Sequence, residues 1–205
     1  MVRLATVIGP FFSKKIVQLA TVLFVAAGLG ACGQSYDDEI IKEYRLTVTN
    51  GTAEHSKIFR ALIAEYNRDA GFEALRWVDS AEQANSAIIV TKGLQQRDGK
   101  VGWGQWLSET EHDKDFTIVP GERIDRTITY SMRLEFDQEY IETRSASTDP
   151  ARLNDVKKLF THEVGHGLML GHANTPADVM YYDISGDKDF DSHFEYVRTF
   201  FGKEP

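Results

Sequence analysis

Two histidines placed one helical turn apart are the residues of this sequence best suited to chemistry. His162 and His166 are four positions apart, so on a helix their imidazoles project from the same face and can bind one metal ion. Zinc accepts imidazole nitrogens at about 2.0–2.1 Å in tetrahedral geometry. His172 becomes a third ligand only if the chain turns sharply after about Leu168, because it cannot lie on that face of a continuing helix. A water molecule would complete the site.

Glu163 directly follows the first of these histidines. From that position its carboxylate can approach a metal-bound water without coordinating the ion. Zinc lowers the pKa of such a water towards about 7, and a carboxylate can then accept its proton and pass it to a leaving amine. The pattern therefore indicates hydrolysis assisted by one zinc ion, with Glu163 as general base. HExxH alone can also arise by chance on a buried helix.

The histidines require a helix that begins well before them. Asp149 or Thr148 can cap its N-terminus, and Pro150 suits its first turn. Apolar residues follow at steps of three and four, which predicts one buried stripe along the helix. These residues are Leu153, Val156, Phe160, Val164 and Leu168.

The residues upstream predict a sheet. Tyr44–Thr49 and Ser86–Thr91 have strand composition, and Ala53–Tyr66 is an amphipathic helix closing near Gly71. Strand, helix and strand in this order imply a crossover between parallel strands. Glycines among the aromatics of Gly99–Trp106 suggest an irregular strand with close backbone approach. Further strands are predicted at Phe116–Val119 and Thr127–Phe136, and a last helix at Asp191–Phe201 before Gly202. The fold class is α+β.

Composition excludes several classes of protein. A length of 205 residues suggests one domain, and 42% hydrophobic with 26% charged residues is typical of a globular chain. The formal charge of −8 argues against a nucleic-acid partner. A single cysteine excludes an intrachain disulfide framework and a cysteine-rich zinc site. We expect a monomer.

Residues 1–31 are predicted to be a targeting segment. Basic residues precede Ile16–Leu29, an apolar run of 14 residues that is short for a membrane span of about 20 but suits a signal-peptide core. The run ends in Leu29-Gly30-Ala31-Cys32, which resembles the lipobox of bacterial lipoproteins. The resemblance implies that Cys32 is lipidated and becomes the mature N-terminus. A plain secretory signal with an incidental cysteine is the alternative.

A lipoprotein would carry a polar tether at residues 32–42 and its catalytic domain at residues 43–205. It would lie in a bacterial cell envelope, anchored to the membrane through Cys32. Gly33 stands where an aspartate would have resembled an inner-membrane retention signal, so the outer membrane is favoured.

The complete motif resembles that of the metzincin zinc endopeptidases. The family motif is HExxHxxGxxH, and residues His162 to His172 have its spacing. Met180 follows within Asp178–Tyr182, where the family has a methionine-containing turn. Among metzincins the spacing is most similar to that of the matrixins. The resemblance implies a zincin domain with a twisted mixed sheet, an active-site helix and a small C-terminal subdomain. It also implies peptide-bond hydrolysis, with Met180 as an apolar floor beneath the metal.

The resemblance implies a further catalytic candidate and a peptide-binding mode. Tyr182 lies where some metzincins have a tyrosine that touches zinc or stabilises the oxyanion; a packing tyrosine is the alternative. The substrate would be an extended peptide paired with an exposed edge strand within Val101–Val119.

The chain departs from the family pattern at Met169, where the family turns out of the helix with glycine. A left-handed methionine costs about 1–2 kcal/mol. The turn is therefore expected to shift to Gly171, with Met169 as a packed helical residue. Cys32 and the short tether leave no cysteine-bearing propeptide, and the structural-zinc histidines of animal matrixins have no evident counterpart.

Three other interpretations stay open. The chain could be a non-catalytic surface lipoprotein whose metal serves structure or binding. Glu195 could replace His172 as third ligand, although the residues around it do not match a helical glutamate motif. Asp187, Asp189 and Asp191 alternate as in a calcium loop, but EF-hand glycine and glutamate are missing, so a solvated turn is expected.

Overall fold

The computed structural model describes residues 36–112 and 124–203. The predicted signal segment, Cys32 and the strand predicted at Phe116–Val119 lie outside these residues. These residues divide into two compact units, one formed by residues 36–41, 108–112 and 124–129 and the other by residues 42–107 and 130–203. The candidate site lies within the larger unit.

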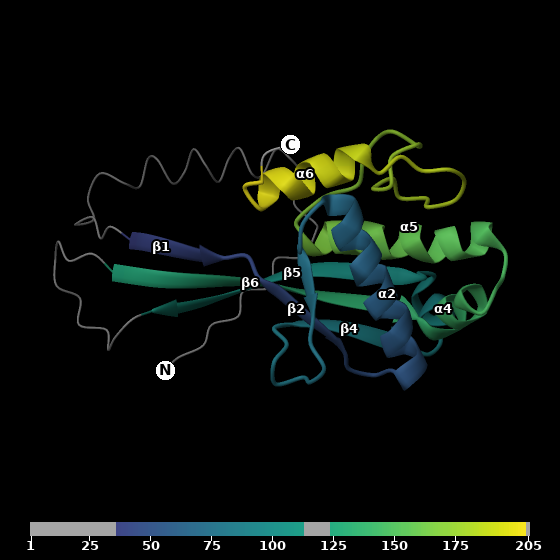
Figure 1. Cartoon of the computed structure of the whole chain (residues 1–205), viewed down its shortest axis with the longest axis horizontal. Helices are drawn as coiled ribbons and strands as arrows, with labels where there is room; N and C mark the ends of the chain where they lie inside the picture. Colours follow the sequence, from purple (N-terminus) through teal and green to yellow (C-terminus); the bar gives the residue numbers. More distant parts are fainter. Residues whose placement is uncertain (1–35, 113–123, 204–205) are drawn as a thin grey trace. The chain divides into compact units, whose positions relative to one another are not determined.

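A parallel sheet is the centre of the larger unit (Figure 1). Strand β2 (Tyr44–Val48) lies between β3 (Leu75–Trp77) and β4 (Ser86–Thr91), and β4 pairs with the second part of β6 (Ile124–Asp137). The strand–helix–strand order predicts the parallel pairing of β2 with β4, and the other two pairings are parallel as well. The short strand β3 was not predicted from the sequence.

Strand β5 (Gly102–His112) pairs with β6 on the side away from β4. The Val101 carbonyl, just before β5, accepts a hydrogen bond from the Asp137 N–H at the end of β6 (2.9 Å), as in an antiparallel pair. The sheet is therefore mixed, as predicted, with β5 at its edge among the described strands.

Helices α2 (Ala53–Ala70) and α5 (Pro150–Gly167) share one face of this sheet. The ring of Phe136 on β6 lies 5.0 Å from that of Phe59 on α2 and 6.2 Å from that of Phe160 on α5. The rings of Phe59 and Phe160 are in turn 6.2 Å apart. This aromatic group joins both helices to the sheet, so it fixes where α5 lies. The arrangement is a mixed α/β one.

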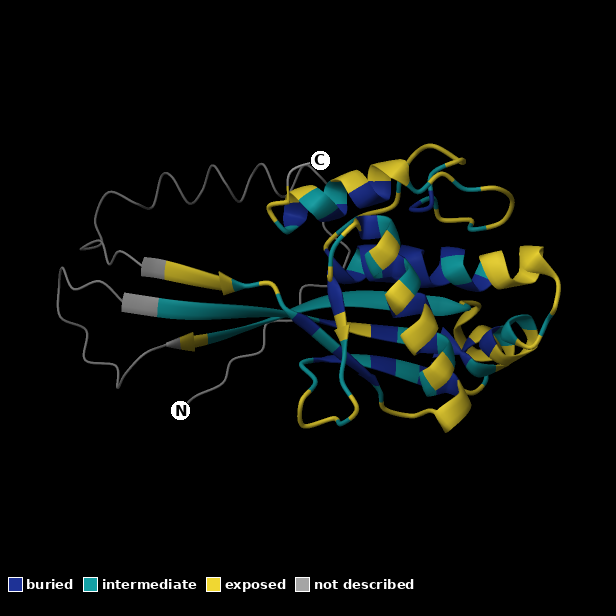
Figure 2. Ribbon diagram, viewed as in Figure 1, coloured by how far each residue is buried: buried dark blue, intermediate teal, exposed yellow. Residues whose placement is uncertain are grey.

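The ends of both long helices follow the predicted signals. The Asp149 side chain caps α5, accepting from the Ala151 N–H, and α2 closes at Gly71 with φ 87°. The stripe prediction is wrong at Leu153, which is 45% exposed although Val156 is buried. Figure 2 shows the reason: the first turn of α5 is exposed and extends past the ends of the strands on which the rest of the helix packs.

Three shorter helices complete the unit. They are α3 (Leu94–Asp98), α4 (Gln138–Ser145) and α6 (Asp191–Phe200). Helix α6 is the predicted last helix, whereas α3 and α4 were not predicted. Among the described residues, no helix is long and apolar enough to cross a membrane.

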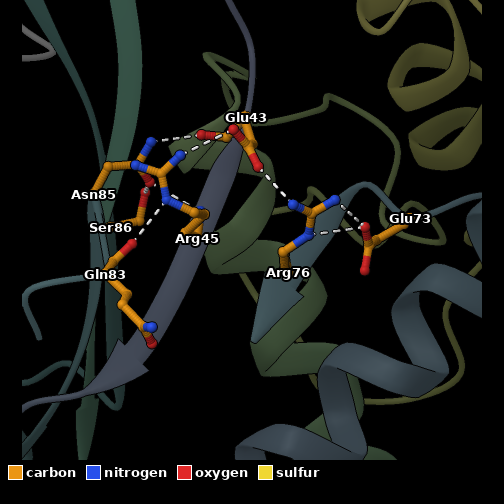
Figure 3. Close-up of polar contacts among 7 residues, drawn as sticks. All are labelled: Glu43, Arg45, Glu73, Arg76, Gln83, Asn85 and Ser86. Atoms are coloured by element: carbon orange, nitrogen blue, oxygen red, sulfur yellow. Dashed lines mark hydrogen bonds and ion pairs between the residues drawn. The ribbon is translucent and has the colours of Figure 1, made fainter. Parts of the chain in front are cut away.

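A polar network connects the starts of β2, β3 and β4 (Figure 3). The Asn85 amide oxygen accepts from the Arg45 N–H and the Ser86 hydroxyl, while its NH₂ group donates to the Glu43 carbonyl. The Ser86 oxygen also accepts from the Met132 N–H of β6 (3.0 Å). The network thereby fixes the register of β6, whose Met132 lies against α5 at Gly167.

The smaller unit contains β1 (Tyr36–Ile41), which pairs in parallel with the first part of β6, from Tyr36↔Ile124 to Ile41↔Thr129. The Arg126 guanidinium pairs with the Asp38 carboxylate on the neighbouring strand (2.7 Å). The prediction of a polar tether over residues 32–42 is therefore wrong for its second half. Hydrogen bonds to β6 hold this polar stretch in a strand, and its composition alone does not indicate this pairing.

Candidate metal centre

The last turn of α5 and the segment after it bring three histidines together. The Nε2 atom of His166 lies 3.1 Å from that of His162 and 3.2 Å from that of His172. One ligand atom from each histidine lies within 4.8 Å of the other two. His162 is buried, His166 half-buried and His172 exposed, so the cluster is open to solvent on the His172 side.

Backbone carbonyls determine which nitrogen of two of these rings carries the proton. His162 Nδ1 lies 2.8 Å from the Val179 carbonyl, and His166 Nδ1 lies 2.8 Å from the Leu170 carbonyl. A carbonyl oxygen can only accept, so each Nδ1 donates and each Nε2 of the neutral ring presents a lone pair. Burial lowers the pKa of His162 to about 4 and also lowers that of His166, so both rings are neutral near pH 7.

The cluster therefore fits a cation. The Nε2 lone pairs of His162 and His166 face one another at 3.1 Å and repel, because neither of these two rings has an Nε2 proton to bridge them. Four ligands at about 2.05 Å around tetrahedral zinc are separated by about 3.3 Å, close to the 3.1 and 3.2 Å between the Nε2 atoms. The ligand pair also lies at the C-terminal end of α5, where the helix dipole favours positive charge. The donor set matches zinc with three protein ligands.

The turn that brings His172 to the cluster is made by Met169. Met169 has φ 70° and is the non-glycine residue with positive φ in the described chain; Gly171 does not share that conformation. The Leu170 N–H donates to the Gly165 carbonyl (2.8 Å) and the Met169 N–H to the His166 carbonyl (3.1 Å), which is a Schellman motif. The prediction that Gly171 makes the turn and that Met169 is packed in the helix is wrong, since Met169 is 43% exposed.

The reason lies in what the early turn achieves. A left-handed residue immediately after Leu168 directs the Leu170 carbonyl back to His166 Nδ1. A turn two residues later would leave that ring nitrogen without this partner. This hydrogen bond between a ring and a carbonyl four residues later therefore outweighs the preference for glycine in the turn.

Met180 lies against the ligand helix. It is 3% exposed, and a Cβ built on Gly165 would overlap its Sδ atom. Gly165 stands between His162 and His166, so the methionine contacts the helix between the two ligands. Its role as an apolar floor beneath a metal stays a prediction.

Glu163 points towards β5 and is 5% exposed. A Cβ on Gly102 would lie 2.7 Å from Glu163 Oε1, and one on Gly104 would overlap the Glu163 carbonyl oxygen. The close backbone approach predicted for this glycine-containing strand is thus confirmed. Burial raises the pKa of Glu163 to about 8, while a hydrogen bond from the Gly104 backbone and the charge of Lys100 lower it. Without a metal ion, the buried carboxyl group therefore keeps its proton to a higher pH than an exposed glutamate does, and a nearby cation would favour the carboxylate.

Comparison with known proteins finds distant similarities among solved structures. No family model matches the chain, and no curated protein sequence matches it. Among solved structures, the chain is similar to archaemetzincin from Methanopyrus kandleri, with a TM-score of 0.40 and 14% identity over 79% of this chain and 97% of that chain. The interpretation of the site rests on the geometry of its histidines and not on this similarity.

The remaining candidates lie away from the cluster. Tyr182 is 68% exposed and its ring packs against Tyr181, 4.3 Å between centroids, so a role at the metal stays a prediction. Within residues 36–112 and 124–203, the group of three potential metal ligands consists of His162, His166 and His172. Neither Glu195 nor the aspartates around Asp189 belong to such a group. His172, and not Glu195, therefore joins the other two histidines.

Sequence reasoning missed the backbone groups of the site. The Val179 and Leu170 carbonyls and the Gly104 N–H each contact a functional side chain. Every residue has these groups, so residue type carries no signal for them. Only the glycines of β5 gave a hint, because they allow close approach of a backbone.

Proposed function

We propose that the chain is a zinc-dependent metalloendopeptidase with a metzincin-like zincin domain over residues 43–205. One observation carries this proposal: the Nε2 lone pairs of His162 and His166 converge with His172, next to a buried carboxyl group in the HExxH arrangement. Structural zinc sites usually have four protein ligands, whereas three converge among the described residues. An open fourth position favours catalysis over the alternative of a purely structural metal.

The residues of the chain have separable tasks in this proposal. His162, His166 and His172 would hold the ion, and the carbonyls behind the first two keep their rings in the binding tautomer. Zinc, when bound, supplies Lewis acidity and lowers the pKa of a water molecule. Glu163 would accept that proton on its carboxylate and deliver it to the amine of the cleaved peptide bond. The hydrogen bond from the Gly104 backbone would keep the carboxyl group oriented for both transfers.

Strand β5 is the proposed site of peptide pairing. Its first residues lie against Glu163, because Gly102 and Gly104 both contact that residue. A peptide hydrogen-bonded along the edge of β5 that lies opposite β6 would pass the general base in extended form. Backbone pairing of this kind selects shape more than sequence. Tyr182 is proposed as a further contact to the reacting group, as in the resemblance noted above.

Location is the second part of the proposal. We infer that Cys32 is lipidated after removal of residues 1–31 and anchors the domain in a bacterial envelope, with the outer membrane favoured. The apolar run followed by Leu29-Gly30-Ala31-Cys32 supports this inference.

The test combines metal analysis with peptide cleavage. We expect about one zinc per chain, bound by wild type and by Glu163→Ala alike, and hydrolysis of a peptide library by wild type alone. Glu195→Ala is the matched control, since this exposed glutamate on α6 is outside the cluster; it should retain zinc and activity. Activity retained in Glu163→Ala would remove Glu163 from the mechanism. Stoichiometric zinc without any cleavage by wild type would favour the non-catalytic alternative.

A further inference from the structure

The carbonyl that orients His162 belongs to a segment without regular secondary structure. Val179 is fully buried, and its oxygen faces His162 Nδ1 at 2.8 Å. A carbonyl in a helix or strand is oriented by the element around it, but residues 178–180 form a turn that only an isolated bridge between Asp178 and Asp189 joins to the neighbouring loop. Another group must therefore keep the Val179 peptide turned towards α5.

The Asp178 carboxylate makes the contacts that do this. Its Oδ1 accepts from the Met180 N–H at 2.7 Å, which closes an Asx turn around Val179. Its Oδ2 accepts from the Ser192 hydroxyl at 2.7 Å, which ties the turn to the first turn of α6. The Val179 N–H donates to the Asp189 carbonyl (2.9 Å). Both sides of the Val179 peptide are thus held, one by the Asx turn and one by the neighbouring loop.

The same turn carries the methionine that lies against α5. The N–H bonded to Asp178 is that of Met180, whose Sδ contacts the helix at Gly165. The Met180 carbonyl in turn accepts from the Ala173 N–H (2.9 Å), one residue after His172. A displacement of the Asx turn would therefore act on two of the three histidines.

We propose that Asp178 is a positioning residue of the metal centre: its carboxylate holds the Val179 carbonyl against His162 and Met180 against the ligand helix. The inference rests on the zinc site proposed above. Asp178 touches neither the metal ligands nor a substrate directly, so it acts through the backbone of residues 179 and 180. Such outer partners of a metal ligand commonly contribute 10–100-fold to metal affinity.

Variants of Asp178 and Ser192 distinguish the effect of the hydrogen bonds from the effect of the negative charge. Asp178→Asn keeps an oxygen that accepts from the Met180 N–H. Its NH₂ group takes the place of the oxygen that accepts from Ser192, and the Ser192 hydroxyl can then accept a hydrogen bond from that group. Ser192 is exposed, and Ser192→Ala removes one of the two hydrogen bonds that the Asp178 carboxylate accepts. Asp183→Ala is the matched control, because Asp183 Oδ1 also accepts from the N–H two residues on, that of Ser185 at 2.9 Å, in the same loop but away from the histidines.

The experiment measures zinc dissociation constants by chelator competition and the visible absorption spectrum of the cobalt-substituted protein. We expect Asp178→Ala to weaken zinc binding by about 10–100-fold and to alter the cobalt spectrum. Asp178→Asn should bind within about threefold of wild type, Ser192→Ala should weaken binding by less than Asp178→Ala, and Asp183→Ala should leave affinity and spectrum unchanged. Far-UV circular dichroism establishes folding of each variant.

Each result decides the inference. Wild-type affinity and spectrum in a folded Asp178→Ala would overturn it, as would an equal loss in Asp183→Ala. If Asp178→Ala does not fold, Asp178→Asn and Ser192→Ala decide: a spectrum of Ser192→Ala identical to wild type, with unchanged affinity, overturns the proposal. A wild-type protein that binds no zinc refutes the proposed function itself, whereas zinc binding that is indifferent to residue 178 refutes only this inference.

Discussion

Met169 provides a test in which the sign of one stability difference decides the conformation of the turn. The residue has φ 70°, a region in which a Cβ atom costs about 1–2 kcal/mol. Met169→Ala and Met169→Gly both remove the long side chain, so the packing lost beyond Cβ is the same in both. The two variants then differ only by the Cβ atom and by the entropy of the unfolded chain.

The expected difference follows from two opposing effects. Glycine escapes about 1–2 kcal/mol of left-handed strain but loses about 0.5–1 kcal/mol more conformational freedom on folding than alanine does. We therefore expect Met169→Gly to be more stable than Met169→Ala by about 0.5–1 kcal/mol. In a helical conformation the order would reverse, because alanine is favoured over glycine there by about 0.8–1 kcal/mol.

Urea denaturation of the zinc-free protein measures this difference, with the slope checked for each variant. Gly171→Ala is the control, since Gly171 lacks a positive φ and an added Cβ would meet nothing within 4 Å. That substitution should be neutral or slightly stabilising, because it restricts the unfolded chain. Alanine more stable than glycine at position 169, or a destabilised Gly171→Ala, would refute the assignment of the turn to Met169.

Three other measurements test the site and its location. Burial raises the pKa of Glu163 from 4.5 to about 8, so the metal-free wild type loses stability as pH rises through this range. In urea titrations, metal-free Glu163→Gln should be about 3 kcal/mol more stable than wild type at pH 7 and almost equally stable at pH 4.5. A gain independent of pH would contradict this. Gly104→Ala should cost about 1–3 kcal/mol in the same assay, because its Cβ overlaps the Glu163 backbone, and an unchanged midpoint would show that β5 does not press on α5. Cys32→Ser should release the protein from membranes on fractionation without altering cleavage of soluble peptides; a variant that stays membrane-bound after signal cleavage would contradict the lipid anchor.

Several elements of the larger unit were predictable from local sequence. Helix α5 begins where Asp149 and Pro150 predict, and α2 ends at Gly71. The parallel pairing of β2 and β4 followed from the strand–helix–strand order. These features depend on capping hydrogen bonds and on side-chain periodicity, which neighbouring residues determine. The spacing of His162 and His166 likewise places both rings on one face of any helix.

Other features depended on contacts between distant segments. Residues 36–41 read as a polar tether, yet they form β1 because β6 offers them hydrogen-bonding partners in the smaller unit. Leu153 continues the apolar spacing of α5, yet it is exposed because the sheet does not extend beneath the first turn of the helix. Periodicity identifies a helix face, but it does not say how far the partner surface reaches.

At the candidate site, the sequence by itself determined which side chains could bind an ion, and the tertiary structure decided how they are presented to it. HExxH specified two ligands and a base through the 3.6-residue period of the helix. The ring tautomers depend on the carbonyls of Leu170 and Val179, and the turn falls on Met169 although glycine is available two residues later. The physical reason is that helical spacing is a local property of the chain. The Val179 carbonyl, by contrast, lies 17 residues from His162 in the chain, so its direction depends on contacts that only folding brings together.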